Sequence, residues 1–293
     1  MSSNASQLRA KFAELLRAPE PLVLPGAYDA FSARLVEQAG FPAVYLGSFA
    51  AAASTYGLPD VGLLTLTEMA DAARRIVDAT NLPVLVDGEN GFYETANIWR
   101  TVETFESAGV VGIHIEDNLG GKHTSRPAGL LPVEQMASRI RAAVDARTDP
   151  NFAIIARSDA AWVYGNDDEA ISRLESYVSA GADIVFAPAV PASKLKAVRT
   201  RIEVPVVVAA DLYDAPGGER PGSTLAEYAD AGADVLLLWY SLIGAAAKSL
   251  TAALDSFKRG AEVADLGDLL LGQKAFESLM GYRDYEQRAT RYE

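Results

Sequence analysis

The sequence predicts an α/β fold, a (β/α)8 TIM barrel with extra C-terminal helices. Eight short apolar runs recur along the chain, and an amphipathic stretch of helix length follows each run. Runs that are apolar on both faces are typical of a parallel sheet covered by helices. Eight such units that close on themselves make a barrel, and the alternative arrangement is a doubly wound open sheet.

Two kinds of lead-in precede these runs in strict alternation, which favours the barrel because its interior layers are filled from alternate strands. Proline, which costs no ladder hydrogen bond at a strand entry, comes before the runs at 22–24, 84–86, 152–155 and 206–208. An Ala-Gly pair, whose glycine can supply a left-handed helix cap, comes before the runs at 44–46, 110–115, 184–186 and 235–238.

After the eighth run the sequence predicts three helical stretches, at 242–258, 266–279 and 283–291. The last stretch is strongly charged, with Tyr285 and Tyr292 interleaved. A polar helix outside a complete barrel is either solvated or packs on another subunit. We therefore expect a catalytic barrel over 1–260 and a helical arm over 261–293, which belongs to the same domain or forms its oligomer interface.

Composition excludes several classes of function. The 293 residues carry 26 basic and 39 acidic side chains, and the net charge of −13 disfavours nucleic acid and anionic membranes as partners. With no cysteine and two histidines, any metal site must consist mostly of oxygen ligands, which favours Mg²⁺, Mn²⁺ or Ca²⁺. The first 19 residues are polar and no apolar run is long enough to cross a bilayer, so we expect a cytoplasmic protein.

Acidic residues follow two neighbouring runs, at the ends where a barrel carries its active site. Asp87 and Glu89 follow the third run, and their spacing of two places both on one side of an extended segment. Glu116 follows the fourth run, with His114 two residues before it. Three converging carboxylates repel one another unless a cation neutralises them, and a hard divalent cation is the simplest solution.

Other polar residues flank this cluster. Arg157 follows the fifth run and suits a substrate carboxylate or phosphate through its bidentate fork. Asp60 lies in a connection, 54–60, that is interpreted as a loop and could bring another acid to the mouth. The Gly-rich segment 120–126 is either a mobile lid or a solvated loop. Asp117 and Asp159 could simply be helix N-caps.

Several motifs resemble the isocitrate lyase/phosphoenolpyruvate mutase superfamily, and most of all its 2-methylisocitrate lyase branch. The motifs are Pro25-Gly26-Ala27-Tyr28-Asp29-Ala30, Tyr56-Gly57-Leu58-Pro59-Asp60, Leu85-Val86-Asp87, Gly112-Ile113-His114-Ile115-Glu116-Asp117 and Ile155-Ala156-Arg157-Ser158-Asp159-Ala160. The likeness spans nearly the whole chain. It implies a barrel whose last helix swaps onto a partner subunit, in a homo-oligomer that is a dimer or a homotetramer.

The resemblance also implies a magnesium (or Mn²⁺) site and a small carboxylate as the substrate. The implied metal cluster consists of Asp60, Asp87, Glu89 and Glu116, with Asp87 the direct ligand. The implied substrate-binding residues are Tyr45, Gly47, Ser48, Asp60, His114 and Arg157, which would hold a 2-oxo acid. The candidate catalytic residues are Tyr45, Lys122, His123 and Arg157.

The chain departs from the lyases at several positions. Their Asp-Ala-Asp is here Asp87-Gly88-Glu89, and their loop with an acid/base cysteine corresponds to 122–126, which has none. Their glutamate after strand six is replaced, and their asparagine after strand seven corresponds to Ala209. Without cysteine, the proton donor would be His123, Tyr45 or water.

These observations lead to a first interpretation and two alternatives. The first is a Mg²⁺-dependent carbon–carbon lyase that acts on a small 2-oxo or 2-hydroxy di- or tricarboxylate through a metal-stabilised enolate. A decarboxylase or a non-standard lyase ranks above a true 2-methylisocitrate lyase because of the altered loop. The alternatives are a phosphonate P–C bond mutase or hydrolase, and a barrel that has lost the chemistry and binds a carboxylate ligand.

Overall fold

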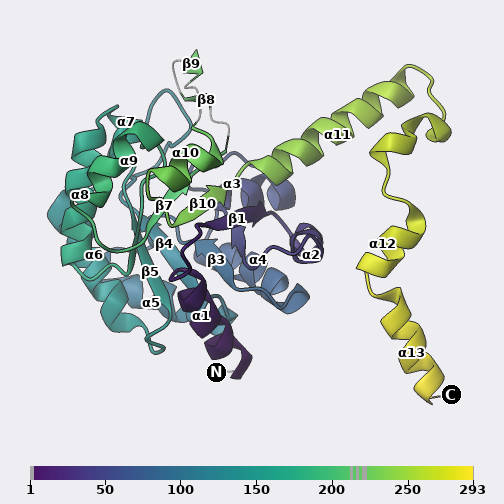
Figure 1. Cartoon of the computed structure of the whole chain (residues 1–293), viewed down its shortest axis with the longest axis horizontal. Helices are drawn as coiled ribbons and strands as arrows, with labels where there is room; N and C mark the ends of the chain where they lie inside the picture. The colour runs from purple at the N-terminus through teal and green to yellow at the C-terminus, as the bar shows by residue number, and fades with distance from the viewer. Residues whose placement is uncertain (1–2, 212–213, 216–217, 220–222, 293) are drawn as a thin grey trace.

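The eight predicted apolar runs form a closed barrel of parallel strands in the order β1-β10-β7-β6-β5-β4-β3-β2 (Figure 1). The structure is a computed structural model, and it describes residues 3–211, 214–215, 218–219 and 223–292. The barrel strands are β1 (Leu22–Ala27), β2 (Val44–Leu46), β3 (Val84–Asp87), β4 (Gly112–Glu116), β5 (Ala153–Arg157), β6 (Ile184–Phe186), β7 (Val206–Ala209) and β10 (Val235–Leu238). The barrel prediction is confirmed.

Helices surround the barrel, as the amphipathic stretches predict. They are α2 (Ala30–Gln38), α4 (Leu66–Ala79), α5 (Ile98–Ala108), α6 (Val133–Ala146), α8 (Asp167–Ser179), α9 (Ala192–Arg199) and α10 (Leu225–Asp230). The glycines of the Ala-Gly pairs all have positive φ, for example 89° at Gly109, which caps α5. Glycine adopts this left-handed conformation without a steric penalty, so each pair ends a helix before the next strand.

Shorter elements lie in the connections. They are α3 (Ser48–Ala51), the π-helical turn η1 (Ala52–Tyr56), η2 (Thr95–Asn97), α7 (Ala160–Val163) and the hairpin of β8 (Asp214–Ala215) and β9 (Gly218–Glu219). The interpretation of 54–60 as a loop is therefore wrong for its first half, because residues 54–56 continue the helical turn that begins in α3.

The core has two layers. One lies between the sheet and the outer helices, and the other fills the barrel interior, where Leu24, Leu85 and Val207 meet. The inner layer continues onto α1 (Ser3–Leu15), whose Leu8 and Phe12 join it. The sequence does not predict this helix, because its apolar positions are few among polar residues.

Arg9 on α1 is completely buried. Its guanidinium donates to Asp149 at 3.0 Å and to the backbone oxygens of Glu106 at 2.7 Å and Val110 at 3.1 Å, and it lies over the Phe152 ring. A buried charge with this many partners ties α1 to the last turn of α5 and to the loops before β4 and β5.

α11 (Ser241–Lys258) extends outward from the barrel before the chain turns back (Figure 1). The C-terminal arm of residues 261–293 contains η3 (Val263–Leu269), α12 (Gln273–Leu279) and α13 (Tyr282–Tyr292). The prediction of one helical stretch over 266–279 is wrong, because the backbone is extended at Leu270 (φ −105°, ψ 128°) and α12 begins only after Gly272. In the described part of the chain, no helix combines the length and apolar character needed to cross a membrane.

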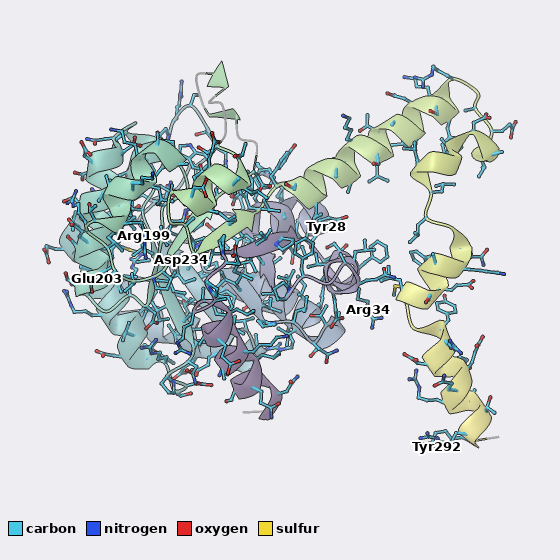
Figure 2. All side chains as sticks on the ribbon, viewed as in Figure 1. Tyr28, Arg34, Arg199, Glu203, Asp234 and Tyr292 are labelled. Carbon is cyan, nitrogen blue, oxygen red and sulfur yellow. The ribbon has the colours of Figure 1, made fainter. Side chains whose placement is uncertain are left out.

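The arm touches the barrel at α2. The Phe276 and Phe31 rings lie 5.5 Å apart, and Arg34 donates to the Leu279 oxygen at 3.0 Å (Figure 2). No described residue of α11 is buried. Its large apolar side chains, and several beyond it, face solvent in the single chain: Leu250, Leu254, Phe257, Leu270, Leu271 and Tyr285.

The buried Arg9 leads to a stability prediction. Arg9→Ala leaves the buried Asp149 carboxylate without its ion pair, and breaking a buried pair in this way costs about 3–5 kcal/mol. Urea unfolding followed by circular dichroism measures this loss. Arg17→Ala, at an exposed position just after the same helix, should change stability by less than about 0.5 kcal/mol. Equal stability of the two variants would contradict the role assigned to Arg9.

Candidate active site

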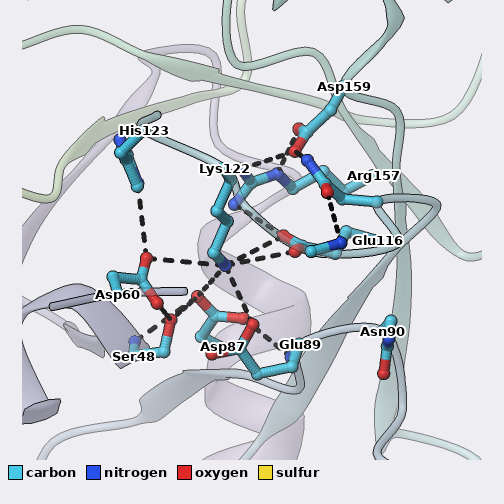
Figure 3. Close-up of polar contacts among 12 residues, drawn as sticks. Ser48, Asp60, Asp87, Glu89, Asn90, Glu116, Lys122, His123, Arg157 and Asp159 are labelled. Atoms are coloured by element: carbon cyan, nitrogen blue, oxygen red, sulfur yellow. Dashed lines mark hydrogen bonds and ion pairs between the residues drawn. The ribbon is translucent and has the colours of Figure 1, made fainter. Parts of the chain in front are cut away.

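Carboxylates converge where β3 and β4 end. Asp87, Glu89 and Glu116 are buried, and one oxygen of each lies within 4.8 Å of the others. Asp60 joins them through Ser48, whose hydroxyl oxygen lies within hydrogen-bond distance of Asp60 Oδ1 at 3.1 Å and of Asp87 Oδ2 at 2.9 Å (Figure 3). The structure thus brings together the four acids that the sequence analysis grouped.

Glu89 reaches this cluster by a route that the sequence analysis did not foresee. The strand ends at Asp87, and Glu89 has a left-handed φ of 50°, so the two side chains do not share one side of an extended segment. Instead, the Glu89 backbone N–H donates to Asp87 Oδ1 at 2.8 Å in a tight turn. Gly88 permits the turn, because a Cβ there would lie 2.7 Å from the His114 oxygen.

Lys122 supplies the positive charge at the centre of the cluster (Figure 3). Its Nζ lies 2.9 Å from Glu89, 3.1 Å from Glu116 and 3.6 Å from Asp60. The side chain is buried although it belongs to the Gly-rich loop after β4. The sequence predicts Lys122 as a candidate catalytic residue but not this role among the acids, and the lysine directly after Gly120-Gly121 is the one signal for it.

The pKa shifts follow from burial and from these charges. Burial raises the pKa of Glu89, and that of Glu116 still more. Burial acts to lower the pKa of Lys122, but the surrounding carboxylates outweigh it and raise this pKa well above its usual value. Burial lowers the pKa of His114 to about 4, so that this ring is neutral at pH 7. Burial also acts to raise the pKa of Asp87, yet its neighbours His114, Lys122 and Arg157 bring it below the usual range.

Arg157 ends β5 and is fixed by acids of the chain itself. It donates to Asp159 at 2.7 and 3.1 Å and lies 3.2 Å from Glu116. Asp159 stands at the N-cap position of α7 but makes no side-chain cap, because Arg157 and Asn118 occupy its oxygens. Asp117 does not cap a helix either, since it accepts from Ser158 and Tyr177.

Tyr45 and His114 form a buried pair under the cluster. The Tyr45 hydroxyl and His114 Nε2 are hydrogen bonded at 2.8 Å, and His114 Nδ1 lies 3.6 Å from Asp87 Oδ1. Burial and the nearby Asp87 raise the pKa of Tyr45 well above its usual value, so its hydroxyl keeps its proton. The His114 ring therefore lies next to both Tyr45 and Asp87.

A cavity opens above these residues. It is lined by Tyr45, Gly47, Phe49, Asp60, Asp87, His123, Arg157, Trp162, Phe186, Pro188, Ala209, Leu237 and Trp239. His123 Nε2 lies 3.3 Å from Asp60 Oδ2 at its edge. A second, separate cavity is lined by Lys122, Glu89 and Glu116. Asp60 and Asp87 are therefore the two acids that line the first cavity.

The donor set fits a divalent metal ion. It consists of carboxylate oxygens, which hard cations such as Mg²⁺ prefer, and three of them are close enough to share one ion. Asp87 and Asp60 are directed toward the cavity, where an ion could also contact a ligand. Lys122 Nζ lies among the same oxygens, 2.9 Å from Glu89 Oε2 and 4.0 Å from Asp87 Oδ2.

The position of Lys122 generates a prediction. Lys122→Met removes the ammonium and leaves the carboxylates to repel one another, which should cost about 3–5 kcal/mol of unfolding free energy in EDTA. Saturating Mg²⁺ should restore more stability to this variant than it adds to the wild-type protein. Urea unfolding with and without Mg²⁺ measures both values, and Lys11→Met at an exposed site is the control. A variant as stable as wild type in EDTA would contradict the assigned role.

Comparisons with known proteins identify the relatives of this chain. The family described as phosphoenolpyruvate phosphomutase matches residues 12–258. The chain is 36% identical over 274 residues to 2,3-dimethylmalate lyase of Eubacterium barkeri, with 93% of each chain covered. It is 33% identical over 281 residues to 2-methylisocitrate lyase of Shewanella oneidensis, with 95% of this chain and 94% of the relative covered.

Among solved structures, oxaloacetate acetylhydrolase in complex with the inhibitor 3,3-difluorooxalacetate superposes with a TM-score of 0.86 at 26% identity. The alignment covers 98% of this chain and 97% of that chain. The resemblance seen in the motifs is therefore confirmed over nearly the whole length. The chain belongs to the phosphoenolpyruvate mutase/isocitrate lyase superfamily.

Proposed function

We propose that this protein is a Mg²⁺-dependent carbon–carbon lyase that acts on a small 2-hydroxy or 2-oxo di- or tricarboxylate. The observation that carries the proposal is the cluster of buried acids beside Arg157 at the floor of a cavity, at the C-terminal end of the barrel. The names of the two lyase relatives support the same class of reaction.

Asp87, with Asp60, Glu89 and Glu116 around it, would hold the Mg²⁺ or Mn²⁺ ion. When bound, such an ion supplies positive charge that stabilises an enolate and polarises a 2-oxo group. Lys122 lies among the acids and does not line the cavity, so we assign it the task of holding Glu89 and Glu116 in place. This assignment makes Lys122 a positioning residue.

The residues of the cavity floor would bind the acid end of the substrate. Arg157 is held rigidly by Asp159 and Glu116, so its orientation is set before a ligand arrives. Backbone groups at Gly47 and Ser48 would bind the same carboxylate, and Tyr45 lines the wall below it. His114 fixes the Tyr45 hydroxyl from behind, which makes its role indirect.

Cleavage of a 2-hydroxy acid requires two proton transfers. A base takes the hydroxyl proton, and the oxygen–hydrogen electron pair becomes the carbonyl bond of the 2-oxo acid product. The carbon–carbon bond breaks, its electron pair is delocalised onto the neighbouring carboxylate, and a donor then protonates that carbon. His123 is the candidate donor, because its ring is at the cavity edge and is oriented by Asp60.

Decarboxylation is the second candidate within this class. It needs no base for a hydroxyl, and in this site the donor cysteine of the related lyases is missing. A panel of oxaloacetate, 2-methylisocitrate, substituted malates and phosphonopyruvate, assayed with Mg²⁺, separates lyase, decarboxylase and P–C bond activity. Turnover of none of them would favour a barrel that only binds a carboxylate.

Asp87 provides the direct test of the metal assignment. Asp87→Ala should lower metal-dependent turnover of the best panel substrate by about 10³-fold or more, because charge stabilisation of the transition state is lost. Steady-state kinetics over a Mg²⁺ titration measures this effect. Asp78→Ala, at an exposed site on α4, should leave the rates unchanged. Unchanged activity of Asp87→Ala would overturn the assignment.

We also propose that residues 261–293 form the interface of a homo-oligomer, a dimer or a homotetramer, with α13 swapped onto a partner subunit. The exposed apolar side chains of the arm support this, since large apolar patches mark interaction surfaces. Deleting the residues after Leu279 should therefore weaken assembly, seen as a later elution volume in size-exclusion chromatography. An unchanged elution volume, with a circular dichroism spectrum that shows a folded barrel, would argue against the swap.

A further inference from the structure

The Lys122 ammonium lies among the oxygens that we assign to the metal ion (Figure 3). Its Nζ is 2.9 Å from Glu89 Oε2, 3.1 Å from Glu116 Oε1 and 4.0 Å from Asp87 Oδ2. These are the same three acids whose oxygens lie within 4.8 Å of one another. Asp60 Oδ2 is 3.6 Å from Nζ, so the fourth acid surrounds the ammonium as well.

An ammonium and a divalent ion at this donor set would repel each other. Lys122, Asp87, Glu89 and Glu116 are each 7% exposed or less, so water screens the repulsion poorly. Mg²⁺ also binds its oxygens at about 2.0–2.1 Å in a near-octahedral arrangement. Nζ stands where the carboxylates converge, and it would interfere with that arrangement. The two cations are therefore expected to compete for the acids.

The other buried cation beside the acids, Arg157, is not placed to compete in this way. It ends β5, and its guanidinium donates to Asp159 at 2.7 and 3.1 Å. It reaches the cluster through Glu116 alone of the three acids, at 3.2 Å. A residue fixed at a strand end with its own carboxylate partner keeps its position, whereas Lys122 belongs to a loop.

The second cavity gives the Lys122 side chain room to move. Lys122 lines this cavity together with Asn118, Gly120 and two of the acids. Gly120 and Gly121 come directly before the lysine, with φ of 122° and 67°, and glycine adopts such backbone conformations readily. The lysine stem has four flexible carbons. Nζ can therefore leave the centre of the acids while the strands of the barrel stay in place.

We propose that Lys122 is a built-in competitor of the divalent ion. In the metal-free protein, its ammonium holds the acids together and lowers the affinity of the site for metal. Ion binding moves the ammonium toward the second cavity, so Lys122 sets the metal concentration at which the site is loaded. The inference rests on the proposed function, because it takes the acids as the metal site.

The first test is a titration of the whole protein with Mn²⁺, followed by electron paramagnetic resonance. Lys122→Met should bind Mn²⁺ at least about tenfold more tightly than wild type, because a like charge is removed from the buried donor set. Lys122→Arg, which keeps the positive charge, should stay within about threefold of wild type. Lys11→Met, at an exposed site, is the control.

Two outcomes of this titration separate the inference from the proposed function. A Lys122→Met variant that is folded by circular dichroism, yet binds Mn²⁺ no more tightly than wild type, would overturn the inference. Absence of Mn²⁺ binding in both wild type and the folded variant would overturn the proposed metal site instead.

The wild-type protein provides a second test that does not depend on the folding of a variant. Acetic anhydride should acetylate Lys122 at least about fivefold faster in saturating Mg²⁺ than in EDTA, because the ammonium loses its carboxylate partners to the ion. Peptide mass spectrometry measures both rates. Lys11 should react equally under the two conditions. Labelling of Lys122 that is no faster with Mg²⁺ would overturn the inference, whatever the affinity of the variants.

Discussion

Four buried carboxylates at one end of the barrel must share positive charge, and this constraint shapes the whole site. Mutual repulsion disfavours the charged form of such carboxylates unless a cation lies among them. Lys122 meets this need from the centre of the cluster, with its Nζ 2.9 Å from Glu89 and 3.1 Å from Glu116. Arg157 meets it on another side, through Glu116 and Asp159. On the cavity side, toward which Asp87 and Asp60 are directed, a divalent ion would supply the remaining positive charge.

The barrel makes this concentration of charge possible. Parallel strands deliver their last residues to the same rim, so Asp87, Glu116 and Arg157 meet although the chain separates them by many residues. Each acid is then held by a short local contact, such as the donation from the Ser48 hydroxyl to Asp87. The strands thus fix where the charged side chains lie, and the connecting loops supply the groups that contact them.

Much of the fold follows from simple patterns in the sequence. The alternation of proline and Ala-Gly lead-ins predicts the strands because both patterns reflect local backbone preferences. The acids at strand ends can also be found from the sequence, because the end of a strand fixes the position of a side chain in a barrel. In contrast, Lys122 enters the cluster through tertiary folding of its loop, and α1 is fixed by Arg9, whose partners are about 100 residues away or more. The turn at Glu89 also depends on a local left-handed conformation that a spacing argument does not contain.

The proposed chemistry depends on one property of the acid cluster, the binding of a single divalent ion through Asp87. Electron paramagnetic resonance of Mn²⁺ counts bound ions directly, without a substrate and without turnover. We predict one bound Mn²⁺ per chain, displaced by Mg²⁺, and loss of that binding in Asp87→Asn. A wild-type protein that binds no Mn²⁺, or an Asp87→Asn variant that binds it as well as wild type, would show that Asp87 does not hold a divalent ion.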